Sequence, residues 1–406
     1  MTKTHLLALS LGVTMIGTGV SAPAWSATPK AAPASASAPQ PNILRLWTAE
    51  FMGRGGGGHS DAELTAMAKR FDVIAAMPKR FSPAQIRLMK AANPKLELAV
   101  YRNATFGPGN LTEDMYAHDA NGERIHAIRW PTTYLMELGS AGWQRKVASS
   151  CVDQVRASGY DYCYLDVLGN APIISEGYIN AWPVHPDGTR WTPQEWITWT
   201  AQISQGVTNA MGRQQYGNGY GAGWRYFHPK FASKPLYAPN KQVAAEGFVR
   251  SGRDPVTSWY SETDWKADVD MMIDTEKAGR GMMTITKIWT DTPTPEATKD
   301  RIHEYALATF LLGTGGKSRF NFLREESPDA PLMEHPYNKI NPGTPVNSYR
   351  KVGGVYRRDF SRALVLVNPT TTARTVTLTR SYTTMNGQTV RGSVRMAPHT
   401  ARILRF

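Results

Sequence analysis

The feature that most constrains the fold is an alternation between residues 42 and 348, in which short apolar, strand-like runs are followed by helical patterns. This alternation is typical of parallel βαβ units. Eight strands with intervening helices are what a closed barrel requires, so we predict an α/β fold, a (β/α)8 TIM barrel. The predicted strands are Asn42–Glu50, Asp72–Met77, Leu96–Arg102, Asp161–Asp166, Tyr216–Trp224, Val243–Phe248, Met282–Ile288 and Lys317–Phe322.

Helix-capping residues mark the segments between these strands. Capping boxes indicate helix N-termini, and a glycine that can adopt a left-handed conformation indicates a C-terminus. An open doubly wound sheet is the alternative, but it would usually carry a Gly-rich phosphate turn after its first strand. The four glycines at 55–58 are interpreted as a loop instead. The cap residues are Ser60 with Glu63, Thr192 with Glu195, Gly159 and Gly212.

The sequence pattern changes near residue 349. From there, short runs of alternating apolar and polar residues are separated by Asn, Gly and Pro turns. We predict a small C-terminal antiparallel β-domain over 349–406 that packs on the barrel. At the other end, a basic start, an apolar run and small residues before position 25 predict a signal peptide over 1–24. An Ala/Pro-rich linker over 25–41 follows. The protein is therefore expected to be secreted or periplasmic, without stable membrane insertion.

The chain carries a net charge of +13 and has a pI of about 9.6. This charge suits an acidic polymer or an anionic surface, and general solubility explains it equally well. The basic residues are scattered, so we expect no nucleic-acid partner.

Two acids are expected at the carboxyl ends of barrel strands, where TIM-barrel sites are built. Asp166 ends the fourth predicted strand, and alternation places Tyr164 and Tyr162 on the same face. Glu246 lies in the sixth strand among small apolar residues, with no basic neighbour in that strand. Its pKa is therefore expected to be raised, as suits a general acid. Two such carboxyl groups are the minimum set of catalytic groups for cleaving a glycosidic bond. The alternative is that each acid caps a helix or pairs with an arginine.

Other residues near predicted strand ends are candidates for binding substrate. Arg102 is a candidate to neutralise one of the acids, and Glu50 to act as a third carboxylate. Tryptophans in loops suit a carbohydrate groove, because indoles stack on the apolar faces of sugars. The predicted substrate-binding residues are Glu50, Tyr101, Arg102, Tyr164, Asn218, Trp224, Lys287 and Trp289.

The sequence lacks the motifs of other hydrolase classes and of metal sites. The sequence contains no G-x-S-x-G elbow, no H-E-x-x-H and no clustered His/Cys set. We expect no cofactor and no metal. The two cysteines, Cys151 and Cys163, are predicted to face each other between a helix and the fourth strand, as a disulfide or as two buried thiols.

Five segments together resemble a known family: LWTAEF, YDYCYLDVLG, AAEGF, LLGTGGKSRFNF and YRRDFSRALVLVNP. They resemble the glycoside hydrolases grouped as hypothetical glycosyl hydrolase family fifteen. They are also distantly similar to endo-α-1,4-polygalactosaminidase barrels, whose fourth strand ends in a similar Leu-Asp. The resemblance covers about residues 42–406. It implies that Asp166 is the nucleophile or base and Glu246 the proton donor.

The expected function is hydrolysis of a glycosidic bond in a polysaccharide or glycoconjugate, through two carboxylates. The substrate is expected to be a polysaccharide or oligosaccharide, acidic if the positive charge contributes to binding. A barrel that binds carbohydrate without cleaving it is the main alternative, and a cell-surface structural protein is a third. The sequence leaves the sugar, the linkage, the stereochemical course and the oligomeric state open.

Overall fold

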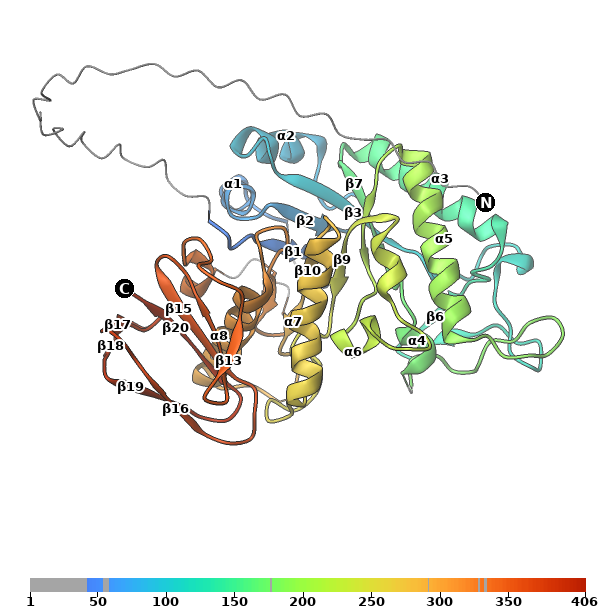
Figure 1. Ribbon diagram of the computed structural model, residues 1–406. Coiled ribbons are helices and arrows are strands. Elements are labelled where there is room, and N and C mark those ends of the chain that lie inside the picture. Colours follow the sequence, from blue (N-terminus) through green and yellow to red (C-terminus); the bar gives the residue numbers. More distant parts are fainter. Residues whose placement is uncertain (1–41, 54–57, 176, 291, 328, 332–333) are drawn as a thin grey trace, which may run out of the picture. The chain divides into compact units, whose positions relative to one another are not determined.

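A computed structural model of the chain describes residues 42–406, apart from positions 54–57, 176, 291, 328 and 332–333 (Figure 1). The predicted signal peptide and linker, and most of the glycine run, lie outside the described residues. The central element is a parallel sheet in the strand order β1-β2-β3-β7-β8-β9-β10. These strands are β1 (Trp47–Ala49), β2 (Val73–Ala76), β3 (Glu97–Asn103), β7 (Tyr162–Asp166), β8 (Gln215–Asn218), β9 (Asn240–Ala245) and β10 (Met282–Thr284).

A further segment closes this sheet into a barrel. Phe320 forms a parallel bridge to Leu46, just before β1, while its neighbour Arg319 bridges to Met283 in β10. Two short strands, β11 (Thr286–Lys287) and β12 (Phe322–Leu323), continue the same parallel pairing. The eighth predicted strand therefore occupies the closing position, and the predicted TIM barrel is confirmed.

Helices follow most of the strands and cover the barrel. The capping boxes predicted at Ser60 and Thr192 are present, and Gly159 and Gly212 adopt the left-handed conformation at helix ends. The α-helices are α1 (Asp61–Arg70), α2 (Pro83–Ala92), α3 (Ala141–Ser158), α4 (Ala171–Ile174), α5 (Pro193–Met211), α6 (Gly223–Tyr226), α7 (Glu262–Lys277) and α8 (Glu296–Gly313). Short 3-10 turns are η1 (Glu50–Gly53), η2 (Glu113–Met115), η3 (Lys234–Tyr237) and η4 (Pro336–Lys339).

The predicted strands differ from the observed ones in their bounds, and the first and the last are much shortened: Asn42–Glu50 is reduced to Trp47–Ala49, and only Phe322 of Lys317–Phe322 lies in a strand, β12. The strand expected at Tyr216–Trp224 ends at Asn218, because Gly221 takes a positive φ of 68° and turns the chain into α6. The strand expected at Val243–Phe248 begins three residues earlier, at Asn240.

The loop after β3 contains a small antiparallel sheet in the order β4-β6-β5, which the sequence analysis did not predict. Its strands are β4 (Phe106–Pro108), β5 (His126–Ala127) and β6 (Trp130–Leu135). Ile128, at the turn between β5 and β6, donates its backbone N–H to the carbonyl of Tyr178 at 3.0 Å. The insertion is thereby joined to the loop that follows β7.

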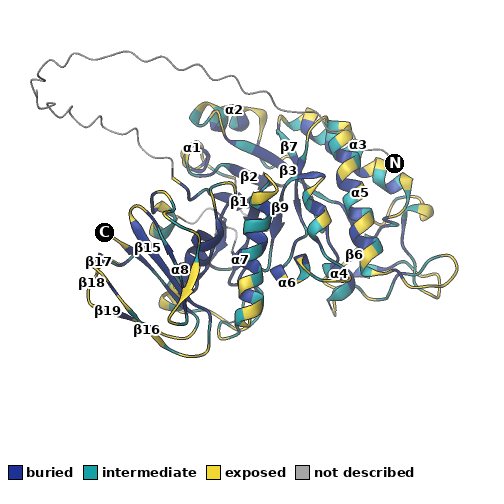
Figure 2. Cartoon of the chain, in the orientation of Figure 1, coloured by how far each residue is buried: buried dark blue, intermediate teal, exposed yellow. Residues whose placement is uncertain are grey.

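The side chains of the barrel strands divide into two layers. One buried cluster contains Trp47, Tyr164 and Tyr216, separated by small residues such as Ala99 and Ala244. Alternate residues of the same strands, among them Cys163 and Leu165, belong instead to the cluster that packs against the helices. Figure 2 shows the strands as buried, while α3, α5 and α7 have buried and exposed sides. The predicted alternation of the fourth strand is confirmed.

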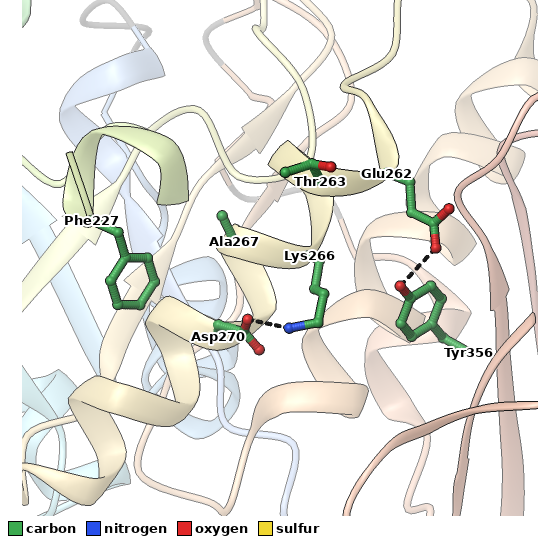
Figure 3. Close-up of a pocket in the computed structure, with 7 residues that line it drawn as sticks. All are labelled: Phe227, Glu262, Thr263, Lys266, Ala267, Asp270 and Tyr356. Carbon is green, nitrogen blue, oxygen red and sulfur yellow. Dashed lines mark hydrogen bonds and ion pairs between the residues drawn. The ribbon is translucent and has the colours of Figure 1, made fainter. Parts of the chain in front are cut away.

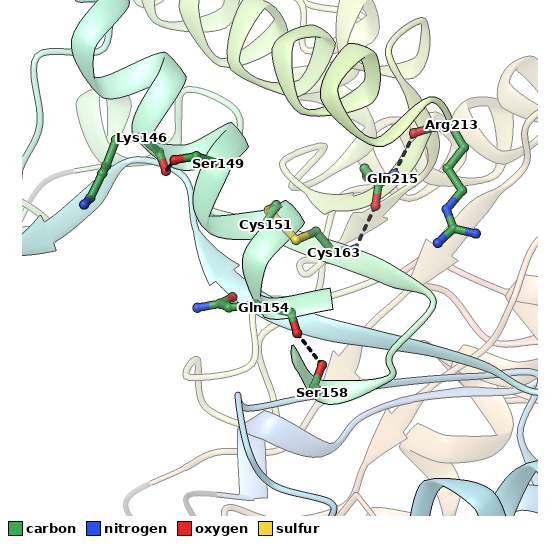
Figure 4. Close-up of a disulfide and its surroundings, with 8 residues drawn as sticks. All are labelled: Lys146, Ser149, Cys151, Gln154, Ser158, Cys163, Arg213 and Gln215. Carbon is green, nitrogen blue, oxygen red and sulfur yellow. Dashed lines mark hydrogen bonds between the residues drawn. A yellow bond between two sulfur atoms is a disulfide. The ribbon is translucent and has the colours of Figure 1, made fainter. Parts of the chain in front are cut away.

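The two cysteines form a disulfide, which settles the alternative left open by the sequence. Cys151 of α3 is bonded to Cys163 of β7, with their Cα atoms 5.9 Å apart (Figure 4). On the neighbouring strand β8, the side chain of Gln215 accepts the backbone N–H of Cys163 at 2.8 Å. Strand β7 is therefore tethered on two sides, three residues before Asp166.

The C-terminal part consists of antiparallel sheets, as predicted. Arg358 of β14 joins it to the barrel helix α8, because its guanidinium donates to the carbonyls of Leu311, Leu312 and Thr314 at 2.7–3.0 Å. One sheet has the order β13-β14-β15-β20-β17-β18, and the other pairs β16 with β19. The strands are β13 (Arg350–Val352), β14 (Val355–Asp359), β15 (Ala363–Asn368), β16 (Arg374–Thr377), β17 (Tyr382–Thr383), β18 (Thr389–Val390), β19 (Ser393–Met396) and β20 (Thr400–Arg405).

In the part of the chain that the structure describes, no helix combines the length and apolarity needed to cross a bilayer.

Candidate active site

Asp166 and Glu246 lie at the same end of the barrel, on either side of strand β8. Asp166 is the last residue of β7, and Glu246 directly follows β9. Between them, Asn218 ends β8, and its Nδ2 donates to Asp166 Oδ1 at 2.9 Å and to Glu246 Oε2 at 2.8 Å. One amide nitrogen therefore bridges the two carboxylates, and the two predicted acids share one site.

The backbone beside each carboxylate is unusual. Val167, directly after Asp166, and Val249, three residues after Glu246, have positive φ values of 58° and 62°. Such values are costly for β-branched residues, and they persist only where the surroundings impose them. At Val249 the buried carboxylate of Asp268 accepts the backbone N–H at 2.7 Å. The chain thus maintains backbone strain directly after Asp166 and three residues after Glu246.

Close backbone packing also fixes the ends of β7 and β8. The N–H of Leu168 donates to the carbonyl of Asn218 at 2.7 Å. At Gly169, whose φ is 74°, an added Cβ would lie 2.1 Å from the carbonyl oxygen of Gly219. Only glycine fits this approach, which keeps Asp166 and Asn218 side by side.

Among the described residues, the side chains that hydrogen-bond to Asp166 are neutral donors. In addition to Asn218, the hydroxyl of Tyr101 donates to its Oδ2 at 2.9 Å. Burial, followed by the charge of Glu246, raises the pKa of Asp166 to about 6, although these two hydrogen bonds oppose the shift. Asp166 therefore holds a proton more readily than an ordinary carboxyl group.

Glu246 differs because Lys287 of β11 forms an ion pair with it through Nζ and Oε1. Burial alone would raise the pKa of Glu246, but this ion pair, the Asn218 hydrogen bond and the charge of Arg253 lower it below its usual value. The expectation of a raised pKa for Glu246 was wrong. The strand of Glu246 has no basic residue, but the next strand along the barrel supplies one.

Tyr164 and Trp289 also lie with this group. The Tyr164 hydroxyl is buried and has no hydrogen-bond partner among the described residues. Burial, together with the charges of Asp166 and Glu246, raises its pKa well above the usual value. The ring centroid of Trp289 lies 4.0 Å from Lys287 Nζ. The structure therefore brings together Asp166, Glu246, Asn218, Tyr101, Tyr164, Lys287 and Trp289.

Three other predicted substrate-binding residues have different surroundings. Arg102 follows Tyr101 and so points to the opposite face, where its guanidinium lies 5.8 Å from the ring centroid of Trp143. It does not neutralise either acid. Glu50 forms ion pairs with Arg80 and, at 3.2 Å, with His59. Trp224 lies on α6 and is 38% exposed.

Tyr178, in the loop after β7, was not predicted. Its ring stacks on Phe106 of the β4-β6-β5 sheet, with centroids 6.0 Å apart. Burial and then the charges of Asp166 and Glu246 raise its pKa, which shows that it lies near both acids. Its position depends on the inserted sheet, and the local sequence carries no signal for that contact.

A cavity of about 330 Å³ lies over α7, between Phe227 and Tyr356 (Figure 3). None of the predicted site residues lines it. Its acids are already partnered: Asp270 with Lys266 at 2.5 Å, and Glu262 with the hydroxyl of Tyr356 at 2.7 Å. The partly buried carboxylate pair is therefore the better candidate active site. Within the described residues, no group of three or more His, Cys, Asp or Glu side chains could hold a metal ion.

A TIM barrel with two carboxylates at the carboxyl ends of its strands is the arrangement of a glycoside hydrolase. The model of the family described as "Hypothetical glycosyl hydrolase family 15" matches residues 95–364. The chain belongs to this family, and the protein is a glycoside hydrolase. The family expected from the sequence segments is confirmed. No curated protein matches the sequence.

Solved structures that are similar to this chain include glycoside hydrolases. A noncanonic maltogenic α-amylase from Thermotoga neapolitana is 10% identical, with a TM-score of 0.50, over 90% of this chain and 98% of that chain. The type I pullulanase of Bacillus subtilis is also 10% identical, with a TM-score of 0.51, over 93% of this chain and 71% of that chain. The glycoside hydrolase domain of PelA from Pseudomonas aeruginosa is 13% identical, with a TM-score of 0.42, over 72% of this chain and 97% of that chain.

Proposed function

We propose that the protein is an exported glycoside hydrolase that cleaves a polysaccharide or glycoconjugate through Asp166 and Glu246. The observation that carries this proposal is the Asn218 bridge, which joins two partly buried carboxylates at the barrel end where TIM-barrel sites lie. One carboxyl group protonates the leaving oxygen, and the other stabilises or attacks the anomeric carbon.

The short bridge favours a retaining mechanism. Asp166 Oδ1 and Glu246 Oε2 both contact Asn218 Nδ2, so the distance between these two oxygen atoms cannot exceed the sum of 2.9 and 2.8 Å. Inverting enzymes hold their carboxyl groups roughly 6.5–9.5 Å apart, to leave room for a water, whereas retaining enzymes hold them roughly 5–5.5 Å apart. We therefore propose a covalent glycosyl-enzyme intermediate.

The aromatic side chains around the acids support a sugar substrate. Trp289 and Tyr101 lie beside Glu246 and Asp166, and Tyr178 lies near both acids. Rings at a site with fixed polar groups suit a ligand that has apolar faces and many hydroxyls. The net charge of +13 is compatible with a polymer that carries some acidic groups.

The test is the release of reducing ends from a panel of neutral and acidic polysaccharides. The wild-type protein is expected to release ends from at least one polymer, and the double variant D166N/E246Q to bind that polymer without cleaving it. If the wild-type protein binds a polymer but releases no ends from any, the barrel binds carbohydrate without cleaving it, and the proposal is wrong.

Export is tested separately, by fractionating cells and sequencing the N-terminus of the mature protein. We expect a secreted or periplasmic protein that begins near residue 25, because Ala22-Pro23-Ala24 offers small residues at the cleavage position. A full-length chain that stays in the cytoplasm would contradict export without affecting the proposed chemistry.

A further inference from the structure

Lys287 is held against Glu246 by contacts along its whole length. The side chain is only 10% exposed, compared with 35% for Glu246. Its ammonium group pairs with Glu246 Oε1 and lies over Trp289, where the ring face attracts a cation. These two contacts hold the ammonium group in place.

The loop after Glu246 is built around the stem of this lysine. An added Cβ at Gly252 would lie 2.1 Å from Lys287 Cγ and 2.5 Å from Cε, so only glycine leaves room for the lysine. The carbonyl of Gly252 accepts the N–H of Trp289 at 2.8 Å. Arg250 donates to the Lys287 carbonyl at 2.7 Å. These contacts fix Lys287 relative to Glu246.

The charged and titratable groups around Glu246 come from several elements. Asp166 lies across Asn218, and the hydroxyls of Tyr164 and Tyr178 lie near both acids. The second cation, Arg253, pairs with Glu326 at 3.3 Å, and its guanidinium lies 5.4 Å from the Trp289 ring centroid. Lys287 is thus the cation in direct contact with a carboxylate of the pair, and that carboxylate is Glu246.

We infer that Lys287 is a positioning residue that keeps Glu246 ionised, so that when the pair holds a single proton, that proton lies on Asp166. This inference rests on the proposed function. It makes Glu246 the nucleophile and Asp166 the proton donor, the reverse of the roles that the family resemblance implies.

The resulting steps conserve atoms and charge. Asp166 gives its proton to the glycosidic oxygen as the bond from that oxygen to the anomeric carbon breaks, and a Glu246 oxygen bonds to the same carbon. The Asp166 carboxylate then takes a proton from water. The water oxygen bonds to the anomeric carbon while the bond to Glu246 breaks, which restores both groups.

The test is a pH titration of the two carboxyl groups by NMR, in protein labelled with ¹³C at the side-chain carboxyls of Asp and Glu. The variants D166N and E246Q assign the two resonances. In the wild-type protein, Asp166 is expected to titrate near pH 6 and Glu246 below the normal glutamate range. In K287M the Glu246 midpoint is expected to rise by more than about one pH unit, and K287R is expected to restore it. An unchanged Glu246 midpoint in K287M would overturn the inference.

Kinetics provide the second measurement, with the polymer that the wild-type protein cleaves. K287M is expected to lower kcat about a hundredfold with little change in KM, because a mostly neutral nucleophile reacts slowly. The acid limb of its pH profile is expected to move to higher pH. The matched control is K241M, because Lys241 also pairs with a glutamate and lies over a tyrosine ring, yet at the other end of the barrel. K241M is expected to keep its activity within about twofold.

These measurements distinguish a failure of the Lys287 inference from a failure of the proposed function. If K287M shows the wild-type pH profile while D166N and E246Q are inactive, the role of Lys287 is wrong and the carboxylate pair stands. If D166N and E246Q remain active, the proposed function fails, whatever the titration shows.

Discussion

The two ends of the barrel contain similar groups in different proportions. At the amino end, Glu97 of β3 accepts from Lys241 of β9 and from the hydroxyl of Tyr216 of β8. Lys241 Nζ also lies 4.4 Å from the ring centroid of Tyr162. At the carboxyl end, Lys287 pairs with Glu246 and lies 4.0 Å from the ring centroid of Trp289. Both ends therefore place a lysine between a glutamate and an aromatic ring.

The difference is the second carboxylate. At the amino end one lysine serves one glutamate, an arrangement that stabilises strand ends. At the carboxyl end Lys287 pairs with Glu246, whereas the neighbouring Asp166 accepts hydrogen bonds from the neutral side chains of Asn218 and Tyr101. An uncompensated buried acid weakens folding, so its presence indicates chemistry rather than structure. This difference supports the proposal that the active site lies at the carboxyl end.

The largest expected effect separates the two ends by activity. D166N and E246Q each remove a group that acts in the transition state, so each is expected to lower kcat/KM by more than about a thousandfold. E97Q at the amino end is expected to change it by less than about threefold, because its contacts are structural. Reducing-end assays on folded protein test this contrast. Equal losses for E97Q and E246Q would remove the functional distinction between the ends.

The next effect concerns β7, which contributes Tyr162 to one end and Asp166 to the other. The disulfide of Cys163 with Cys151 closes a short loop, with a sequence separation of 12. The C151S/C163S variant is expected to lose about 3 kcal/mol of unfolding free energy, since the reduced unfolded chain gains entropy. Denaturant unfolding measures this loss. Activity at 25 °C is expected to persist, because Cys163 faces the helices. An inactive but fully folded variant would show that the disulfide positions Asp166.

Replacing an acid by its amide is expected to change the free energy of unfolding in opposite directions at the two ends of the barrel. The pKa of Asp166 is raised to about 6 in the folded protein, against about 3.9 in an unfolded chain. Its ionisation therefore weakens folding above pH 6, and this penalty disappears below pH 4. D166N is expected to stabilise the protein at pH 7 by roughly 2–3 kcal/mol and to have little effect at pH 4.

E97Q breaks an ion pair and is expected to destabilise the protein by roughly 1 kcal/mol at pH 7. Unfolding midpoints of D166N and E97Q at both pH values measure the contrast. A D166N variant that is less stable than the wild-type protein at pH 7 would contradict the assigned cost of Asp166.

The smallest effect concerns the amide between the acids. N218A is expected to lower kcat/KM by roughly 10–100-fold, because both carboxylates lose a shared donor that orients them. Asn240, at the amino end of the next strand, donates to the Leu236 carbonyl at 2.8 Å and is the matched control. N240A is expected to affect stability rather than the activity of folded protein. Comparable activity losses in both variants would mean that Asn218 has only a structural role.

Features that depend on local sequence could be predicted. The capping boxes at Ser60 and Thr192 involve residues three positions apart. The eight strands follow from apolar runs, and the acids at their ends follow from the direction of parallel strands. The inward face of Tyr164 and the outward face of Cys163 follow from alternation. The same rule, applied to Tyr101 and Arg102, would have excluded Arg102.

Features that depend on distant partners could not be predicted. Lys287 lies 41 positions from Glu246, and its ion pair reverses the pKa shift expected from the apolar strand around Glu246. Strand β9 begins at Asn240 because Lys241 and Gln242 find partners in Glu97 and in the carbonyls of Arg280 and Lys317. In sequence these polar residues look like a loop. Tyr178 reaches the site through an inserted sheet that has no barrel pattern.

The most direct test of the central claim, that Asp166 and Glu246 form one closely spaced catalytic pair, is the anomeric configuration of the first-formed product, followed by proton NMR during hydrolysis. Two carboxylates joined through a single amide nitrogen predict that the product initially retains the configuration of the substrate. A product that first appears with the inverted configuration would contradict the claim.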